Sequence, residues 1–153
     1  MLYDIIQDDK FEKIMCEHIE KTINYLFEKD QPFAILANIE LVDFKPLLPE
    51  EIMSNLPQFT LFMLANYTYE SATLKDEILS FEAGFGKDNF GSVVSVPVNS
   101  IMQIIVEDTP IAVNLSASVA KKREEKKGDI ETSMDALLSN PENLRLLKKR
   151  KKK

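Results

Sequence analysis

The sequence contains no tryptophan, one cysteine and one histidine. A lone Cys16 excludes an internal disulfide and a zinc site built from several cysteines. His18 falls on the polar side of a predicted helix, without cysteines or carboxylates at a spacing typical of a metal site or a catalytic triad. We therefore expect no metal, no cofactor and no enzymatic activity. The shortage of cysteine favours a reducing, cytoplasmic environment.

Long apolar segments are also missing. The longest apolar runs, residues 33–39 and 101–106, are far shorter than the roughly 20 residues that a membrane-spanning helix needs. No apolar segment typical of a signal peptide follows Met1. The sequence therefore predicts a protein that does not enter a membrane.

Arginine is absent from the first 118 residues, which hold 7 lysines and 19 acidic residues, a net charge of −12. Residues 119–153 hold 12 lysines or arginines and 6 acidic residues, a net charge of +6. This contrast predicts one acidic folded domain over residues 1–118 and a separate basic tail. Because phosphate neutralisation requires clustered cations, the acidic domain is not expected to bind nucleic acid.

An amphipathic helix is predicted over residues 9–28, where apolar residues recur at spacings of three and four. Asp8 or Asp9 supplies its N-terminal cap, and Asp30 and Pro32 mark its end.

After this helix, short apolar runs bounded by turn residues predict strands at residues 33–42, 59–67, 78–85, 93–97 and 111–115. Residues 86–91 have a glycine at each end and predict a hairpin, hence antiparallel pairing. Three prolines limit residues 44–57 to a connection with at most one helical turn, and residues 98–106 are predicted as a short helix. The expected class is α+β, mainly β.

The tail divides into two predicted parts. Residues 119–143 contain no aromatic residue and alternate charges without an apolar face, a composition typical of a disordered, flexible linker. Residues 144–153 form a basic end that contains a short aliphatic motif.

Two distant pieces of the sequence resemble one family. Residues 79–86 (LSFEAGFG), followed by residues 94–97 (VSVP), resemble the stringent starvation protein B family, the SspB adaptors of the ClpXP protease. The likeness runs without gaps from about Phe59 to Gly86 and resumes at Val94 after a slightly longer hairpin. Residues 144–148 (LRLLK) are similar to the tail motif with which that family contacts the N-terminal domain of the ClpX unfoldase. Both pieces occur in the family's order.

The resemblance implies a Sm-like antiparallel β-sandwich or barrel and a homodimer. It also implies an adaptor that holds the ssrA tag, the peptide that transfer-messenger RNA adds to stalled translation products, and delivers tagged proteins to ClpXP. The peptide-binding residues implied by position are Ala65, Ala83, Phe85 and Gly86. The residues implied for docking to ClpX are Leu144, Arg145, Leu146, Leu147 and Lys148. The dimer interface expected on the apolar stripe of the first helix comprises Phe11, Ile14, Met15, Ile19 and Ile23.

A second hypothesis stays open, in which the chain is an RNA- or ribosome-associated small β-barrel module that uses the basic run Lys148 to Lys153. The two hypotheses predict different behaviour. Affinity for RNA should fall steeply with salt, whereas docking to an unfoldase should depend on the leucines.

Overall fold

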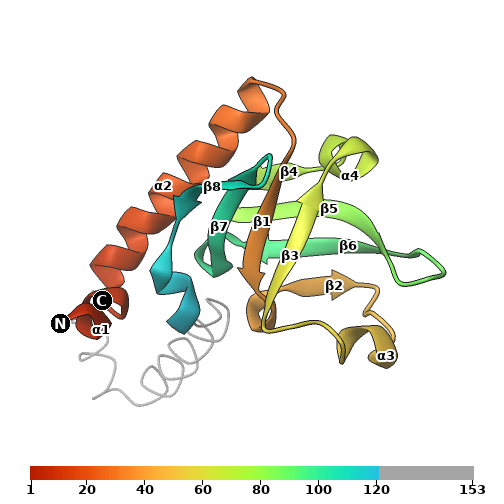
Figure 1. Cartoon of the computed structure of the whole chain (residues 1–153), viewed down its shortest axis with the longest axis horizontal. Coiled ribbons are helices and arrows are strands. Elements are labelled where there is room, and N and C mark those ends of the chain that lie inside the picture. Colours follow the sequence, from red (N-terminus) through yellow and green to blue (C-terminus); the bar gives the residue numbers. More distant parts are fainter. Residues whose placement is uncertain (121–153) are drawn as a thin grey trace, which may run out of the picture. The chain divides into compact units, whose positions relative to one another are not determined.

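Antiparallel strands follow a long helix in the chain, as the sequence predicts (Figure 1). The structure is a computed structural model that describes residues 1–120, and these residues form one folded unit, Met1–Ala120. The helices are α1 (Leu2–Ile6), α2 (Asp9–Glu28), α3 (Glu50–Met53) and α4 (Asn66–Glu70), with 3₁₀ turns η1 (Ile39–Leu41), η2 (Val98–Ser100) and η3 (Leu115–Val119). The strands are β1 (Phe33–Asn38), β2 (Asp43–Lys45), β3 (Phe59–Leu64), β4 (Thr73–Lys75), β5 (Ile78–Phe85), β6 (Phe90–Pro97), β7 (Ile101–Val106) and β8 (Thr109–Val113).

The strands form two antiparallel sheets of four. Sheet A has the order β3-β1-β7-β8, and sheet B has the order β2-β6-β5-β4. Figure 1 shows the strands of sheet A crossing those of sheet B at a steep angle, an arrangement in which the two inner faces share one core. The predicted α+β class, mainly β, is confirmed.

Helix α2 begins and ends where the sequence predicts. The Asp8 side chain accepts a hydrogen bond from the Lys10 backbone N–H at 3.4 Å and caps the first turn. The helix buries one narrow stripe, which comprises Cys16, Ile19, Ile23 and Leu26. This stripe packs against β4, β7 and the turns η2 and η3, so the helix closes one side of the core.

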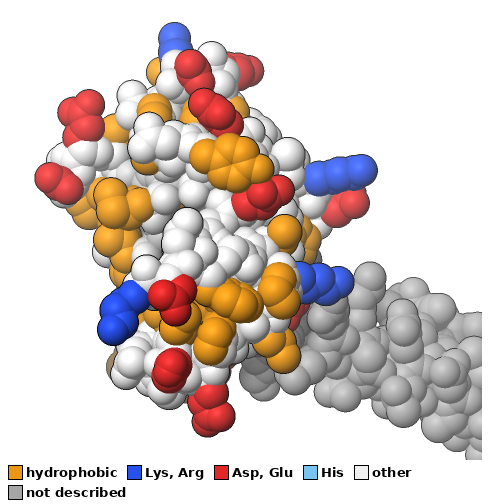
Figure 2. Space-filling model, turned by 90° about the vertical axis from the view of Figure 1, so that its right-hand side faces the viewer, with side chains coloured by type: hydrophobic (Ala, Val, Ile, Leu, Met, Phe, Trp, Pro, Cys, Tyr) orange, Lys and Arg blue, Asp and Glu red, His pale blue; other side chains and the backbone are white. Residues whose placement is uncertain are grey.

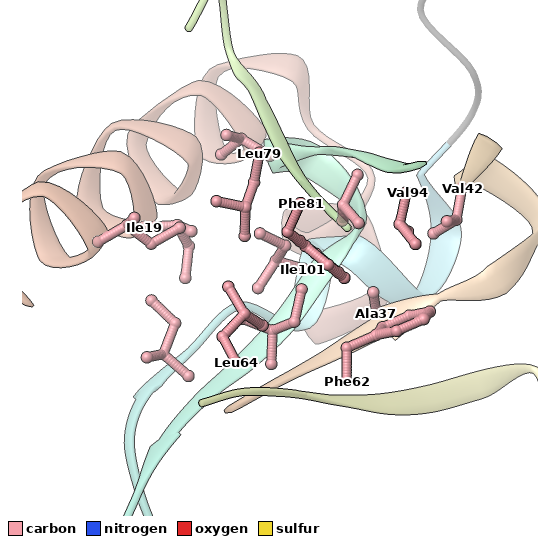
Figure 3. Close-up of a cluster of buried hydrophobic side chains, with 14 of the residues drawn as sticks. Ile19, Ala37, Val42, Phe62, Leu64, Leu79, Phe81, Val94 and Ile101 are labelled. Carbon is pink, nitrogen blue, oxygen red and sulfur yellow. The ribbon is translucent and has the colours of Figure 1, made fainter. Parts of the chain in front are cut away.

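The core lies between the two sheets and under α2 (Figure 3). In Figure 3, Ile19 of the helix faces Leu64 of sheet A, while Leu79, Phe81 and Val94 enter from sheet B. Phe81 is the largest of the fully buried side chains. Burial of a side chain of this size contributes on the order of 2–3 kcal/mol to folding, so the β5–β6 hairpin is anchored where it enters the core.

Residues 98–106 do not form the predicted helix. Only η2 is helical there, and residues 101–106 form β7. The pairing of β7 with β1 shifts by one residue, since Leu36 pairs with Gln103 and Ala37 with Ile101. The shift places Ile101 and Ile104 on the buried face, three residues apart. Because this spacing also occurs between apolar residues of an amphipathic helix, the sequence pattern predicts a helix where the chain forms a strand.

Two predicted strands are shorter than expected. Within residues 33–42, β1 ends at Asn38 and the turn η1 follows; within residues 59–67, β3 ends at Leu64 and α4 follows. The single helical turn expected in residues 44–57 is α3, and the hairpin expected at residues 86–91 joins β5 to β6. Of the helices in residues 1–120, none has the length and apolarity that crossing a membrane requires.

Candidate functional site

The β5–β6 hairpin extends an apolar row past the closed core. Leu79 and Phe81 are buried, and Ala83 and Phe85 follow on the same face of β5 but are only half-buried. The Phe85 ring meets the Phe44 ring edge-on, with centroids 5.7 Å apart. The row therefore becomes accessible where the hairpin leaves the core.

Gly86 closes this row at the hairpin turn. Its φ of +75° lies in the left-handed region, which glycine adopts without strain. A Cβ atom at this position would lie 2.9 Å from Cδ1 of Ile52 in α3. Glycine thus allows the turn and lets α3 approach it. Three of the four predicted peptide-binding residues, Ala83, Phe85 and Gly86, are brought together in this way.

The fourth predicted residue, Ala65, lies elsewhere. It is exposed at the junction of β3 and α4, where it lines a hollow of about 410 Å³ on the outer face of sheet A. Leu61, Met63 and Ile105 share this lining, but the hairpin residues do not. Ala65 therefore lines a hollow that the other three predicted peptide-binding residues do not line.

A polar link joins α4 to β5 beside Ala83. The Tyr67 hydroxyl donates a hydrogen bond to Oε1 of Glu82 at 2.7 Å, and the Glu82 backbone N–H donates to Oγ of Ser71 at 2.9 Å. Because the carboxylate accepts this hydrogen bond and its charge opposes a phenolate, the pKa of Tyr67 is raised above its ordinary value. In the same helix, burial and then the charge of Asp30 raise the pKa of Tyr69.

Sequence reasoning missed this link. Tyr67 and Glu82 are separated by 15 residues, a distance that carries no helical or strand period. Only the turn at α4 brings the two side chains together, and residues 59–67 were expected to be a strand.

Figure 2 shows the end of the molecule that carries α3, α4 and the hairpin. Hydrophobic side chains gather there in two groups, and both acidic side chains and lysines lie around these groups. This surface therefore offers apolar contacts surrounded by charges of both signs.

The predicted dimer interface needs a correction. Ile19 and Ile23 are completely buried within a single chain, so neither side chain is available to a partner. The apolar stripe predicted to form the dimer interface is the side of α2 that packs against the core. Phe11 and Met15 are half-buried, whereas Ile14 points away from the core and is 57% exposed.

The remaining predicted sites have different outcomes. The docking motif, residues 144–148, lies outside the described residues, as do residues 121–143 of the predicted linker. Within residues 1–120, no group of three or more histidine, cysteine or acidic side chains is placed to hold a metal ion.

Comparison with known proteins adds no assignment, since neither a protein-family model nor a curated protein matches this chain. The functional reading therefore rests on the chain's own residues.

Proposed function

We propose that this chain is a substrate-delivery adaptor. Its folded domain binds the ssrA tag of stalled translation products, and its tail docks on the ClpX unfoldase. The observation that carries the proposal is the accessible row Ala83, Phe85 and Gly86 on the hairpin. These residues belong to the segment that resembles the SspB family. The small residues Ala83 and Gly86 leave room for a peptide backbone and the Phe85 ring supplies an apolar wall, which suits an extended peptide.

The proposed mechanism needs no bond chemistry. An adaptor raises the concentration of substrate near the unfoldase by joining two weak contacts. The composition of residues 119–143 predicts a coil, and a coil of about 25 residues has a root-mean-square span of roughly 25–30 Å. Through such a tether the second contact becomes intramolecular, at an effective concentration on the order of millimolar. A weak contact by residues 144–148 is then sufficient.

The proposal is tested by adding the full-length chain to ClpXP and a reporter that carries the ssrA tag, at limiting reporter concentration. We expect faster degradation of the tagged reporter and an unchanged rate for an untagged one. Fluorescence anisotropy of a labelled tag peptide measures the first contact separately. If the chain neither binds the tag peptide nor speeds degradation, the adaptor function is wrong and the RNA-associated hypothesis becomes the better one.

We also propose that the protein is a homodimer that uses the exposed side of its first helices. Ile14 and Tyr25 are eleven residues apart, which places them three turns apart on one face of α2. Helix α1 adds further exposed apolar side chains close to α2, namely Leu2, Tyr3 and Ile5. The exposed polar residues His18 and Lys21 lie between Ile14 and Tyr25 on this face, so the proposed interface joins separate apolar contacts.

We expect Ile14→Asp to halve the mass measured by light scattering, because a carboxylate would be buried in the interface. The matched variant Ile19→Ala should lower the free energy of unfolding by about 2–5 kcal/mol, the usual cost of truncating a buried isoleucine, and keep the dimer mass. A monomeric wild-type chain at micromolar concentration would contradict the dimer.

A further inference from the structure

Sheet A is apolar on both of its faces. One row of paired residues, with one residue from each strand, is buried in the core and comprises Phe62, Ile35, Ile104 and Ala112. The rows on either side of it along the strands point to the opposite, outer face. They comprise Leu61, Leu36, Gln103 and Val113 in one row, and Met63, Ala34 and Ile105 in the other. Because an antiparallel sheet with one face in water usually alternates apolar and polar residues, this outer face has the composition of a covered surface.

The outer face is accessible and has acidic residues beside it. Leu61, Met63 and Val113 are 50%, 69% and 47% exposed. The hollow of about 410 Å³ is lined by Leu61 and Met63 and also by Glu107 and Asp108 of the turn between β7 and β8. Among the described residues that line this hollow, none is a lysine. The face therefore suits a segment with aliphatic and positively charged side chains.

The C-terminal end of the chain carries both kinds of side chain. Residues 144–148 contain three leucines, and residues 148–153 are all lysine or arginine. Residues 1–118 have a net charge of −12, whereas residues 119–153 have a net charge of +6. A second copy of the folded domain would bring further acidic residues toward Glu107 and Asp108. Charge complementarity therefore favours the tail over a second copy as the occupant of this face.

The described part of the chain ends beside the same sheet. The turn η3 follows β8 and contacts β7 and β1. In this turn the Ala117 carbonyl accepts a hydrogen bond from the side chain of Asn38, the last residue of β1. The hollow lies near Ala34, so roughly 15 Å of strand separates it from Asn38. A coil of about 25 residues spans roughly 25–30 Å, which is enough for residues 144–153 to reach the face.

We propose that residues 144–153 dock on the outer face of sheet A in the same chain, with the leucines against the apolar side chains and the cations near Glu107 and Asp108. At an effective concentration on the order of millimolar, a dissociation constant of about 100 µM would keep about 90% of the tails docked. The contact itself does not require the adaptor function, but its consequence rests on it. A docked motif is withheld from ClpX, which must compete with the domain for the same leucines.

The test is binding of a labelled peptide of residues 144–153, followed by fluorescence anisotropy. A chain that ends at Asn143 leaves the face free, and we expect it to bind the peptide. The full-length chain, whose own tail competes, should bind the peptide about tenfold more weakly. Equal affinities for the two chains, or no binding to either, would overturn the proposal. So would equally tight binding of a peptide in which serine replaces the three leucines, since that peptide keeps every charge.

Neutralising the acidic turn tests the position of the contact in the chain that ends at Asn143. Glu107→Gln with Asp108→Asn should weaken peptide binding about fivefold and reduce its salt dependence. The matched control is Asp76→Asn with Glu77→Gln, which changes the same residue types in the turn between β4 and β5, where both residues also have positive φ. The control should leave the affinity unchanged. Equal losses in the two variants would mean that the peptide follows the overall charge, and would contradict docking at this face.

Met63→Gln tests the apolar part of the contact. The side chain is largely exposed, so the fold should persist, and thermal unfolding measures whether it does. We expect peptide binding to weaken about fivefold, because a polar amide replaces an apolar contact. If the peptide does not bind and Met63→Gln instead lowers the mass measured by light scattering, the face holds a second copy and the proposal is wrong.

Degradation of the tagged reporter by ClpXP separates this inference from the proposed function. If both are right, Glu107→Gln with Asp108→Asn in the full-length chain should increase the stimulation at limiting ClpX, because more tails are free. Peptide binding as expected, without any stimulation by the full-length chain, would overturn the adaptor function and leave the docked tail standing. Stimulation without peptide binding would overturn the docked tail alone.

Discussion

Leu146→Asp is expected to abolish the stimulation of ClpXP while leaving the affinity for the tag peptide unchanged. Leu146 is at the centre of the LRLLK motif, and an aliphatic side chain at the centre of a small contact carries much of its binding energy. An aspartate there would have to be desolvated against an apolar surface. The measurement is the degradation rate of the tagged reporter, which should fall about tenfold or more, toward the rate without adaptor.

Two further chains separate the leucines from the charges. A chain that ends at Asn143 should behave like Leu146→Asp, because both lose the apolar contact. Replacing Lys151, Lys152 and Lys153 with serine should change the rate much less and mainly alter its salt dependence. If the lysine variant fails and Leu146→Asp still delivers substrate, the tail acts through charge and the leucine motif is not the docking site.

Ala83→Gln is expected to weaken binding of the tag peptide about tenfold or more. Ala83 is half-buried on the inner face of β5, between the core residue Phe81 and the exposed end of the hairpin. A glutamine would occupy the space that the peptide needs and would leave its amide without a hydrogen-bond partner when the peptide binds. Anisotropy of the labelled tag peptide measures the loss, and delivery should fall with it.

Val93→Gln is the matched control for this substitution. Val93 lies on the neighbouring strand β6 and pairs with Glu82, and its exposed side chain points to the opposite face of sheet B. The same glutamine there should leave the affinity unchanged. A similar loss in both variants would mean that the sheet has been disturbed, and it would contradict a specific contact between Ala83 and the peptide.

The elements that the sequence predicts well are those whose burial follows one simple period. Helix α2 has a cap at Asp8 and a stripe at spacings of three and four, and it was predicted with its observed bounds. Strand β5 alternates buried and accessible residues up to the glycine turn, so the hairpin was also predicted. In both elements, local signals and tertiary packing agree.

The elements that were predicted wrongly depend on partners distant in the chain. The bulge in β7 arises from pairing with β1, some 65 residues earlier, and no window of local sequence contains that information. Strands β2 and β4 have three residues each, too few to show alternation. The turn after Asn38 is set by its side chain, which accepts a hydrogen bond from the Glu40 backbone N–H.

The candidate site was predicted in part for the same reason. The residues near Phe85 share one hairpin, so their sequence order already brings them together. An amphipathic stripe, in contrast, indicates that one face of a helix is buried. It does not show whether that face packs against the same chain or against a second copy. Ile19 and Ile23 illustrate that ambiguity, which burial in the structure resolves.

Hydrogen bonds between distant parts of the chain have a consequence for synthesis on the ribosome. The Asn99 side chain donates a hydrogen bond to the Glu12 carboxylate across 87 positions of the chain, and the Asn38 side chain donates to the Ala117 carbonyl across 79. A nascent chain therefore cannot complete this domain until nearly all of its 120 residues have emerged. Until then the sheets and turns against which the apolar stripe of α2 packs are incomplete. Topologies dominated by such distant contacts also fold slowly. During that interval, a domain proposed to deliver the products of stalled synthesis for degradation is itself an incomplete translation product with exposed apolar surface.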